Sequence, residues 1–403
     1  MGSTPLAGLR VLDLSKVLAG PLCAQSLGDM GAEVIKVESP DGDETRGWPP
    51  FHHAADGSDH GAIFMAANRN KRSIALDLRR PEAQAVVHRL ARDSDVVIES
   101  FGPGVAARLG VDAATLRALN PRLVCCSISG YGSVGPMRDG KGYDVILQAF
   151  CGLVTMTGMP EGPSVRAPYS PVDQATGAHA MAGILALLLQ RERTGVGGTV
   201  EASLFDTATG FVGYMLQGWW SRGTEPQRAG SGHESLCPYQ AFECADRPLL
   251  LGVANDGLWR RFCAVAGLQD LVDHPDFARN TQRVAHRERT VARVAQVMRT
   301  RPRDTWLAQM SDAGIPCAPL HTLGELDAHP HSRASGMVRE HDDERLGHWR
   351  SVAQPLRING TRNAPRRAPP ARGMHTHELL REAGYDDAAI AALRAAGAID
   401  AVE

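Results

Sequence analysis

Short apolar runs that alternate with helical patterns over the first 130 residues constrain the fold of this chain more than any other feature of its sequence. The runs predict strands, and the segments between them predict helices. We expect strands at 10–14, 33–38, 72–78, 95–99 and 122–127, and helices at 21–30, 81–92 and 116–119. Apolar strands separated by helices indicate a parallel sheet that is buried on both faces and joined by right-handed crossovers.

The middle of the chain predicts one long helix and then a change of domain. The helix at 174–193 is so rich in Ala, Gly and Leu that it should pack closely against another element. A strand at 199–202 and a helix at 203–221 should follow it. Near Arg222 the composition shifts to Gly, Pro and Ser, which is typical of a hinge or an active-site loop.

Beyond that loop the patterns predict a smaller domain and a return to the first one. Further helices are expected at 256–268, 287–300, 303–313 and 376–396, with an extended Pro- and Arg-rich connector at 363–373. We therefore predict an α/β fold with a Rossmann-like doubly wound parallel sheet. Residues 1–223 and 329–403 should form this large domain, and 224–328 a smaller α+β domain.

Composition excludes several classes of protein. With 403 residues and a net charge of −2, the chain does not have the charge of a non-specific nucleic-acid binder. Its eight cysteines include no C-x-x-C pair and favour buried, reduced thiols. The N-terminus lacks the pattern of a signal peptide, and the longest apolar stretch, 181–189, is too short to span a bilayer. We expect a cytoplasmic protein with no membrane partner.

Several familiar motifs are missing. The first strand is followed by SKVLAGP instead of G-x-G-x-x-G, which disfavours an NAD-dependent oxidoreductase. The chain contains no P-loop, no G-x-S-x-G nucleophile elbow and no H-E-x-x-H. Its close histidine pairs lie in polar, turn-like segments, so we expect no metal site.

Asp173 is the strongest candidate for chemistry. It leads into the helix predicted from 174, so one interpretation is that it caps this helix. The other interpretation uses the same position: the helix dipole would keep the carboxylate ionised, and an ionised carboxylate can attack an activated carbonyl. The residue by itself leaves both open.

Cationic side chains and loops gather near the predicted strand ends. Lys71 and Arg72 precede the third strand and Arg79 follows it, while Arg108 and Lys141 lie beyond the fourth and fifth strands. Ligands of doubly wound sheets bind beyond the carboxyl ends of the strands. Several cations there suit a polyanion such as the phosphates of a nucleotide or of coenzyme A.

Seven ordered motifs resemble those of the family III CoA-transferases, the formyl-CoA transferase and carnitine CoA-transferase type. They lie at 12–21, 31–38, 70–74, 99–104, 142–144, 173–177 and 238–242. The resemblance covers nearly the whole chain. It implies that Asp173 attacks an acyl-CoA thioester, and that mixed anhydrides and an aspartyl-CoA thioester carry CoA to a carboxylic acid. CoA is then a substrate, and no permanently bound cofactor is implied.

The resemblance also implies a set of CoA contacts, carried over motif by motif. These are Leu18, Ala19, Leu76, Arg79, Ser100, Phe101, Gly102, Arg108, Lys141, Tyr143 and Asp144. It further implies an interlocked homodimer. Because the covalent relay must exclude water, the Gly-rich loop at 229–233 is a candidate lid.

Two departures from the formyl enzyme affect the substrate. Ser39 stands where that enzyme has Arg near the adenine end of CoA, and Leu18 where it has Gln, so no amide is present for a group of formate or oxalate size. The segment at 238–255 is more similar to succinyl-CoA:glutarate CoA-transferases, which favours succinyl-CoA or a similar dicarboxylyl-CoA as the donor.

Two alternatives remain besides the disfavoured oxidoreductase. An α-methylacyl-CoA racemase would share the fold, but Tyr143 occupies the position of the His that acts in proton transfer there, and the pKa of a free Tyr is about three units above that of His. A non-catalytic CoA-binding protein would keep the cations but would not need Asp173.

Overall fold

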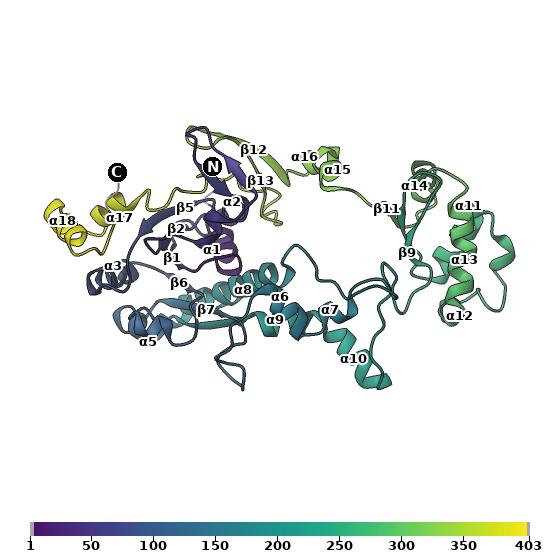
Figure 1. Cartoon of the computed structure of the whole chain (residues 1–403), viewed down its shortest axis with the longest axis horizontal. Helices are drawn as coiled ribbons and strands as arrows, with labels where there is room; N and C mark the ends of the chain where they lie inside the picture. The colour runs from purple at the N-terminus through teal and green to yellow at the C-terminus, as the bar shows by residue number, and fades with distance from the viewer. Residues whose placement is uncertain (1–3, 401–403) are drawn as a thin grey trace. The chain divides into compact units, whose positions relative to one another are not determined.

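The computed structural model describes residues 4–400, and its contacts divide the chain into two compact units. The first unit comprises Met1–Leu153, Ala167–Trp220 and Pro330–Glu403, and the second comprises Val154–Arg166 and Ser221–His329. In Figure 1 the purple and blue N-terminal part of the chain and its yellow C-terminal part both belong to the first unit. Each unit has its own apolar core.

The first unit contains the predicted parallel sheet. Its strands are β1 (Arg10–Leu14), β2 (Glu33–Glu38), β5 (Lys71–Ala75), β6 (Val96–Glu99), β7 (Val124–Ser129) and β8 (Gly198–Ser203). They run parallel in the order β5-β2-β1-β6-β7-β8 (Figure 1). This order confirms the doubly wound α/β fold. The order reverses between β1 and β6, and in such sheets the crevice at the reversal is where ligands bind.

The apolar strands bury both faces because successive side chains point to opposite sides. Val11 packs in the cluster that includes α1 and α8, and its neighbour Leu12 packs in the cluster that includes α3, α5, α17 and α18. The first two helices are Ala19–Asp29 and Pro171–Thr194; the other four are Pro81–Arg92, Ala113–Leu119, Thr376–Glu382 and Asp387–Ala395. The sheet is therefore the middle layer between two layers of helices.

Small residues bring α8 close to its neighbours, as the composition of this helix predicts. A β-carbon on Gly177 would lie 2.6 Å from the backbone oxygen of Ala19 in α1, and one on Gly183 would lie 2.7 Å from a methyl of Val200 in β8. Within residues 4–400, α8 is also the helix with the length and apolar composition to cross a membrane. Core helices of water-soluble proteins share both properties, so this finding is weak evidence for a membrane span.

Two predicted elements differ clearly from the structure. The third strand ends at Ala75 instead of residue 78, and the helix expected at 203–221 is divided into α9 (Leu204–Phe211) and α10 (Gly213–Arg222). Two hairpins were not predicted, because their strands are short or largely polar and carry no clear alternation. They pair β3 (Phe51–His53) with β4 (Asp59–Gly61) and β12 (Val338–Asp343) with β13 (Gly347–Val352).

Shorter helices connect these elements in the first unit. They are η1 (Glu44–Gly47), α2 (Ala62–Ala67), α4 (Val105–Arg108), α6 (Asp144–Phe150) and α16 (Pro330–Ala334), while α7 (Leu153–Met156) spans the boundary between the units. The connector expected at 363–373 contains no helix or strand. The predicted terminal helices are present as α17 and α18.

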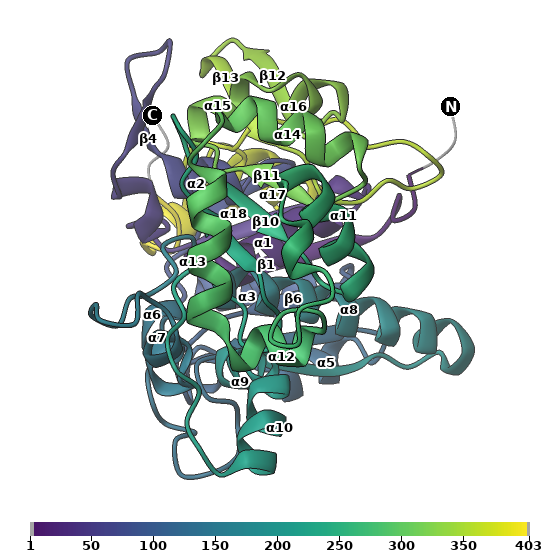
Figure 2. The ribbon, with the colours of Figure 1, turned by 90° about the vertical axis from the view of Figure 1, so that its right-hand side faces the viewer.

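The second unit packs helices on a small antiparallel sheet (Figure 2). Its strands are β9 (Tyr239–Phe242), β10 (Leu249–Gly252) and β11 (Cys317–Pro319), in the order β11-β10-β9. Its helices are α11 (Asp256–Ala266), η2 (Gln269–Leu271), α12 (Asn280–Ala285), α13 (Arg287–Met298), α14 (Arg303–Asp312) and α15 (Leu323–Ala328). Trp259 and Trp306, both fully buried, lie in its core.

The contact between α1 and α8 predicts the effect of one methyl group. Gly177→Ala should lower the free energy of unfolding by about 1–3 kcal/mol, since the added carbon meets backbone that cannot move without shifting a helix. Gly210→Ala is the matched control: it adds the same methyl to α9, where nothing lies within 4 Å. Thermal unfolding of the two variants should separate them, and equal melting temperatures would contradict the close contact.

Candidate active site

Two carboxylates share the N-terminus of α8. This helix begins at Pro171, and Asp173 lies in its first turn. Asp144, the first residue of α6, is buried, and one of its carboxylate oxygens accepts the backbone N–H groups of Val172 at 2.8 Å and of Asp173 at 3.1 Å. Asp144 therefore satisfies the end of α8. The interpretation of Asp173 as the helix cap is wrong, because the N-cap position belongs to Ser170.

The carboxyl of Asp173 has an unusual environment. Burial, and then the nearby charge of Asp144, raise its pKa to about 7. The expectation that the helix end keeps this carboxylate ionised is wrong in direction, because Asp144 accepts the N–H groups that would have stabilised its charge. Near neutral pH the carboxyl of Asp173 therefore exchanges its proton, and its ionised form is poorly solvated.

Asp173 lines a cavity of about 310 Å³ where the strand order reverses. The walls come from the loops after β1 (16–20) and β6 (100–103), from the end of β7 (128–130), and from 138 and 140–143. All three strands present their carboxyl ends here, as expected for a ligand site in this fold. Lys16, Arg138 and Lys141 bring positive charge to the walls, and Glu44, which lies 3.0 Å from the ammonium of Lys16, compensates one of these cations.

A second cavity of about 350 Å³ adjoins the first. It lies over the carboxyl ends of β1 and β2 and over the segment that follows β5. Lys16 and Phe101 line both cavities, so the two lie side by side at these residues. Together they could hold a long ligand whose one end reaches Asp173.

The structure brings most of the expected CoA contacts together. The cavity of Asp173 is lined by Leu18, Ala19, Ser100, Phe101, Gly102, Lys141 and Tyr143, and the second cavity by Leu76, Arg79 and, again, Phe101. Arg108 lines neither: it is exposed at the end of α4. Asp144 lines neither as well, since its carboxylate is buried against α8.

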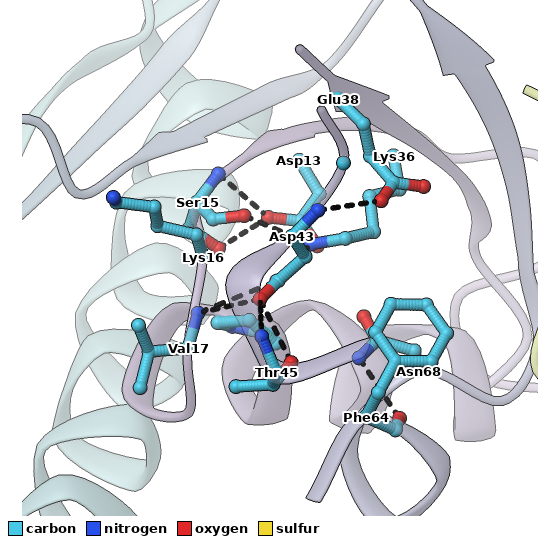
Figure 3. Close-up of polar contacts among 12 residues, drawn as sticks. Asp13, Ser15, Lys16, Val17, Lys36, Glu38, Asp43, Thr45, Phe64 and Asn68 are labelled. Carbon is cyan, nitrogen blue, oxygen red and sulfur yellow. Dashed lines mark hydrogen bonds and ion pairs between the residues drawn. The ribbon is translucent and has the colours of Figure 1, made fainter. Parts of the chain in front are cut away.

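A buried ion pair supports the loop after β1 (Figure 3). Lys36 and Asp43 lie 3.0 Å apart with side chains 1% exposed. Lys36 also donates to the backbone oxygen of Ser15 at 2.9 Å, and Asp43 accepts the N–H of Val17 at 3.3 Å. Val17 has φ 71°, a conformation that costs a β-branched residue about 1–3 kcal/mol. The pair therefore holds a strained loop that lines the cavity of Asp173.

Lys71 belongs to the same buried network. Its ammonium lies 2.8 Å from Asp13 and donates to the backbone oxygen of Pro21 and to Asn68, both at 2.9 Å. Burial lowers the pKa of Lys71 to about 8 although Asp13 opposes this shift. The expectation that Lys71 and Arg72 bind a polyanion is wrong, because Lys71 is fully buried and Arg72 pairs with glutamates of α17.

This network was missed in the sequence, although a signal was present. Asp13 and Lys36 interrupt strands that are otherwise apolar, RVLDL and EVIKVE. A charge inside a strand buried on both faces must find a partner of opposite charge. Two such charges in neighbouring strands, with Lys71 opening the next, could have indicated a buried ionic network.

The Gly-rich segment at 229–233 belongs to the second unit and is anchored there. Gly230 donates to the backbone oxygen of Gly158 at 3.0 Å, and the guanidinium of Arg228 donates to Gly162 at 3.0 Å. The role of this segment as a lid stays a prediction. The residues of both units that the structure describes include no group of three or more His, Cys, Asp or Glu that could hold a metal ion.

Comparisons with known proteins agree over nearly the whole chain. The model of CoA-transferase family III matches residues 6–376. An acyl-CoA transferase of Fusarium pseudograminearum is 38% identical over 98% of this chain and 88% of its own. A succinate–glutarate CoA-transferase of Agrobacterium fabrum is 37% identical over 94% and 95%. The crystal structure of a CAIB/BAIF family protein from Brucella suis is 34% identical, with a TM-score of 0.84 over 95% of this chain and 100% of that one.

The buried pair predicts a large effect for a substitution that keeps the side chain's shape. Asp43→Asn should lower the free energy of unfolding by about 3 kcal/mol, because it removes the carboxylate paired with the buried Lys36, whose charge is then compensated only from a greater distance by Asp13 and Glu38. Glu340→Gln is the control, since Glu340 pairs only with exposed arginines and should change stability by at most about 1 kcal/mol. Urea denaturation of both variants measures the difference, and similar losses would argue against the role given to Lys36 and Asp43.

Proposed function

The chain belongs to CoA-transferase family III, and on this premise we propose that it moves CoA from an acyl-CoA to a carboxylic acid with Asp173 as the nucleophile. The membership itself confirms the resemblance drawn from the ordered motifs. The observation that carries the proposal is the position of Asp173: its carboxyl lines a cationic cavity at the reversal of the strand order, with a pKa raised to about 7.

The proposed relay has four steps, each of which makes one bond and breaks one. A carboxylate oxygen of Asp173 attacks the thioester carbonyl, the C–S bond breaks, and CoA leaves as a thiolate. The thiolate then attacks the aspartyl carbonyl of the mixed anhydride and releases the donor's carboxylate. The incoming carboxylate attacks the aspartyl-CoA thioester and expels the thiolate again. Attack of this thiolate on the acceptor's carbonyl yields the new acyl-CoA and restores Asp173.

The surroundings of Asp173 suit this chemistry. A poorly solvated carboxylate with a raised pKa is a better nucleophile than one in water. Leu18, Ile128 and Leu204 give the cavity apolar walls that limit the access of water to an anhydride. Lys16 and Lys141 offer positive charge to an anionic ligand.

The name of the Agrobacterium relative supports a dicarboxylyl donor. That protein is named succinate–glutarate CoA-transferase and is 37% identical to this chain. We extend the proposal to succinyl-CoA or a similar short dicarboxylyl-CoA as the donor. A panel of acyl-CoA donors tests this part, and a strong preference for a donor without a second carboxylate would contradict it.

We also propose that the active form contains two copies of the chain. Large apolar side chains are exposed on α6 and α10, among them Phe150 at 53%, Tyr214 at 73% and Trp220 at 63%. Such exposed apolar groups mark interaction surfaces in soluble proteins. Light scattering in solution should give twice the mass of one chain, and the mass of a single chain would contradict a homodimer.

We further propose a cytoplasmic location. All eight cysteines are free, as expected in a reducing compartment. The apolar helix α8 packs against α1, β7 and β8 within the first unit. Cell fractionation tests this location, and recovery in the membrane fraction would contradict it.

A covalent adduct on Asp173 is the main test. With succinyl-CoA and hydroxylamine, the aspartyl carbonyl should be captured as a hydroxamate, and peptide mass spectrometry should place it at Asp173. Asp173→Asn should show no adduct, whereas Asp206→Asn, which alters another first-turn aspartate in α9, should keep it. Absence of an adduct with every acyl-CoA, combined with exchange of the substrate's α-proton, would favour a racemase.

The same adduct should depend on pH in a defined way. Because the attacking group must be ionised and its pKa is raised to about 7, the rate of adduct formation should rise as the pH increases through about 7. Asp144→Asn should move this rise to lower pH, since the charge of Asp144 contributes to the raised pKa. Rapid quenching and intact-protein mass measure the rate, and an unchanged profile in the variant would contradict the coupling of the two carboxyls.

A further inference from the structure

The second cavity is the place for the nucleotide part of CoA if the proposed function holds. The thioester must reach Asp173 in the first cavity, so the opposite end of the ligand lies in the adjoining one, beyond Lys16 and Phe101. Leu78, Phe101 and Leu109 give this second cavity apolar surface of the kind that packs against a base.

Most of the charge inside this cavity is already compensated. Lys36 pairs with Asp43, and Glu38 accepts two N–H groups of Arg46 at 2.7 and 2.8 Å. Arg79, which is largely exposed, donates to both oxygens of Asp77. These pairs leave few unpaired cations inside the cavity that could bind a phosphate. A phosphate should therefore bind at the rim of the cavity.

The rim on the β2 side is formed by the turn 39–42. The N–H of Gly42 closes this turn on the backbone oxygen of Ser39 at 2.9 Å, and Ser39 itself brings no charge. Asp41 adds a carboxylate to the same turn. The turn by itself is therefore not suited to an anion.

Arg372 reaches this turn from the far end of the sequence. Its guanidinium donates to the backbone oxygen of Pro40 and to the carboxylate of Asp400. Its stem lies close enough to Gly42 that a β-carbon there would be 3.1 Å from the δ-carbon of Arg372. The side chain is 40% exposed. The backbone beside it is held because the N–H of Gly373 donates to the hydroxyl of Ser73 in β5 at 2.8 Å.

We infer that Arg372 binds a phosphate of the nucleotide part of CoA at the rim formed by Pro40 and Gly42. Only one nitrogen of the guanidinium is engaged with residues 4–400, so Nε and the other terminal nitrogen are available to phosphate oxygens. Asp400 and Asp77 neutralise Arg372 and Arg79 without a ligand, and a phosphate can compete for both cations. Arg372 thus brings a cation to the turn 39–42, which contains no cationic side chain of its own. The inference rests on the proposed function.

Calorimetric titration of CoA and of 3′-dephospho-CoA into the full-length protein tests the inference. Arg372→Ala should weaken CoA binding roughly tenfold or more, the usual loss for a hydrogen bond to a charged group. If dephospho-CoA binding is unchanged by Arg372→Ala, the contact is to the 3′-phosphate, and if it weakens as well, the contact is to the pyrophosphate. Both results support the inference, and equal CoA affinity in Arg372→Ala and the wild type overturns it.

A matched variant separates this role from a structural one. Asp400→Asn breaks the same ion pair but keeps the guanidinium, so CoA affinity should be retained or increased. If Asp400→Asn weakens CoA as much as Arg372→Ala does, Arg372 only holds the C-terminal segment and the inference is wrong. Arg381→Ala removes another arginine that pairs with an exposed aspartate and should leave CoA affinity unchanged. Failure of the wild type to bind CoA at all would instead overturn the proposed function, and this inference with it.

Discussion

The buried charges beneath the loop after β1 support both cavities, because residues of this loop line both of them. Lys36 in β2 and Asp43 after it hold the backbone of Ser15 and Val17, and this loop continues to Leu18 and Ala19, which line the cavity of Asp173. Burying Asp13, Lys36, Asp43 and Lys71 costs desolvation energy, and the attraction between opposite charges offsets only part of it. The benefit is structural, because each charged group has a partner that fixes its position. The strained backbone at Val17 is therefore held in one conformation.

The two carboxylates at the N-terminus of α8 have different environments. Asp144 accepts the helix N–H groups and stays buried, while Asp173 faces the cavity and receives none of them. The charge of Asp144 thus adds to the burial that raises the pKa of Asp173 to about 7.

Much of the first unit could be predicted because its strands are buried on both faces. Apolar runs such as 10–14 and 33–38 agree with β1 and β2 residue for residue, and the helix at 81–92 agrees with α3. The hairpins β3–β4 and β12–β13 could not be predicted, since polar strands on the surface carry no periodic signal. The break between α9 and α10 lies at Val212, next to Gly213 and close to Gly210, and these two glycines were a signal that the sequence analysis missed.

Sequence by itself determined the type of sheet and the family, because both depend on local pattern or on ordered motifs, and it singled out Asp173 as the candidate for chemistry. The tertiary structure decided which charged side chains are buried in ion pairs and which are accessible to a ligand. Lys71 looked like a ligand contact but is buried with Asp13, whereas Arg372, distant in sequence, lies beside Pro40. Asp144 likewise proved to serve the helix. A charge's role depends on its solvation and its partners, and both are set by residues far away along the chain.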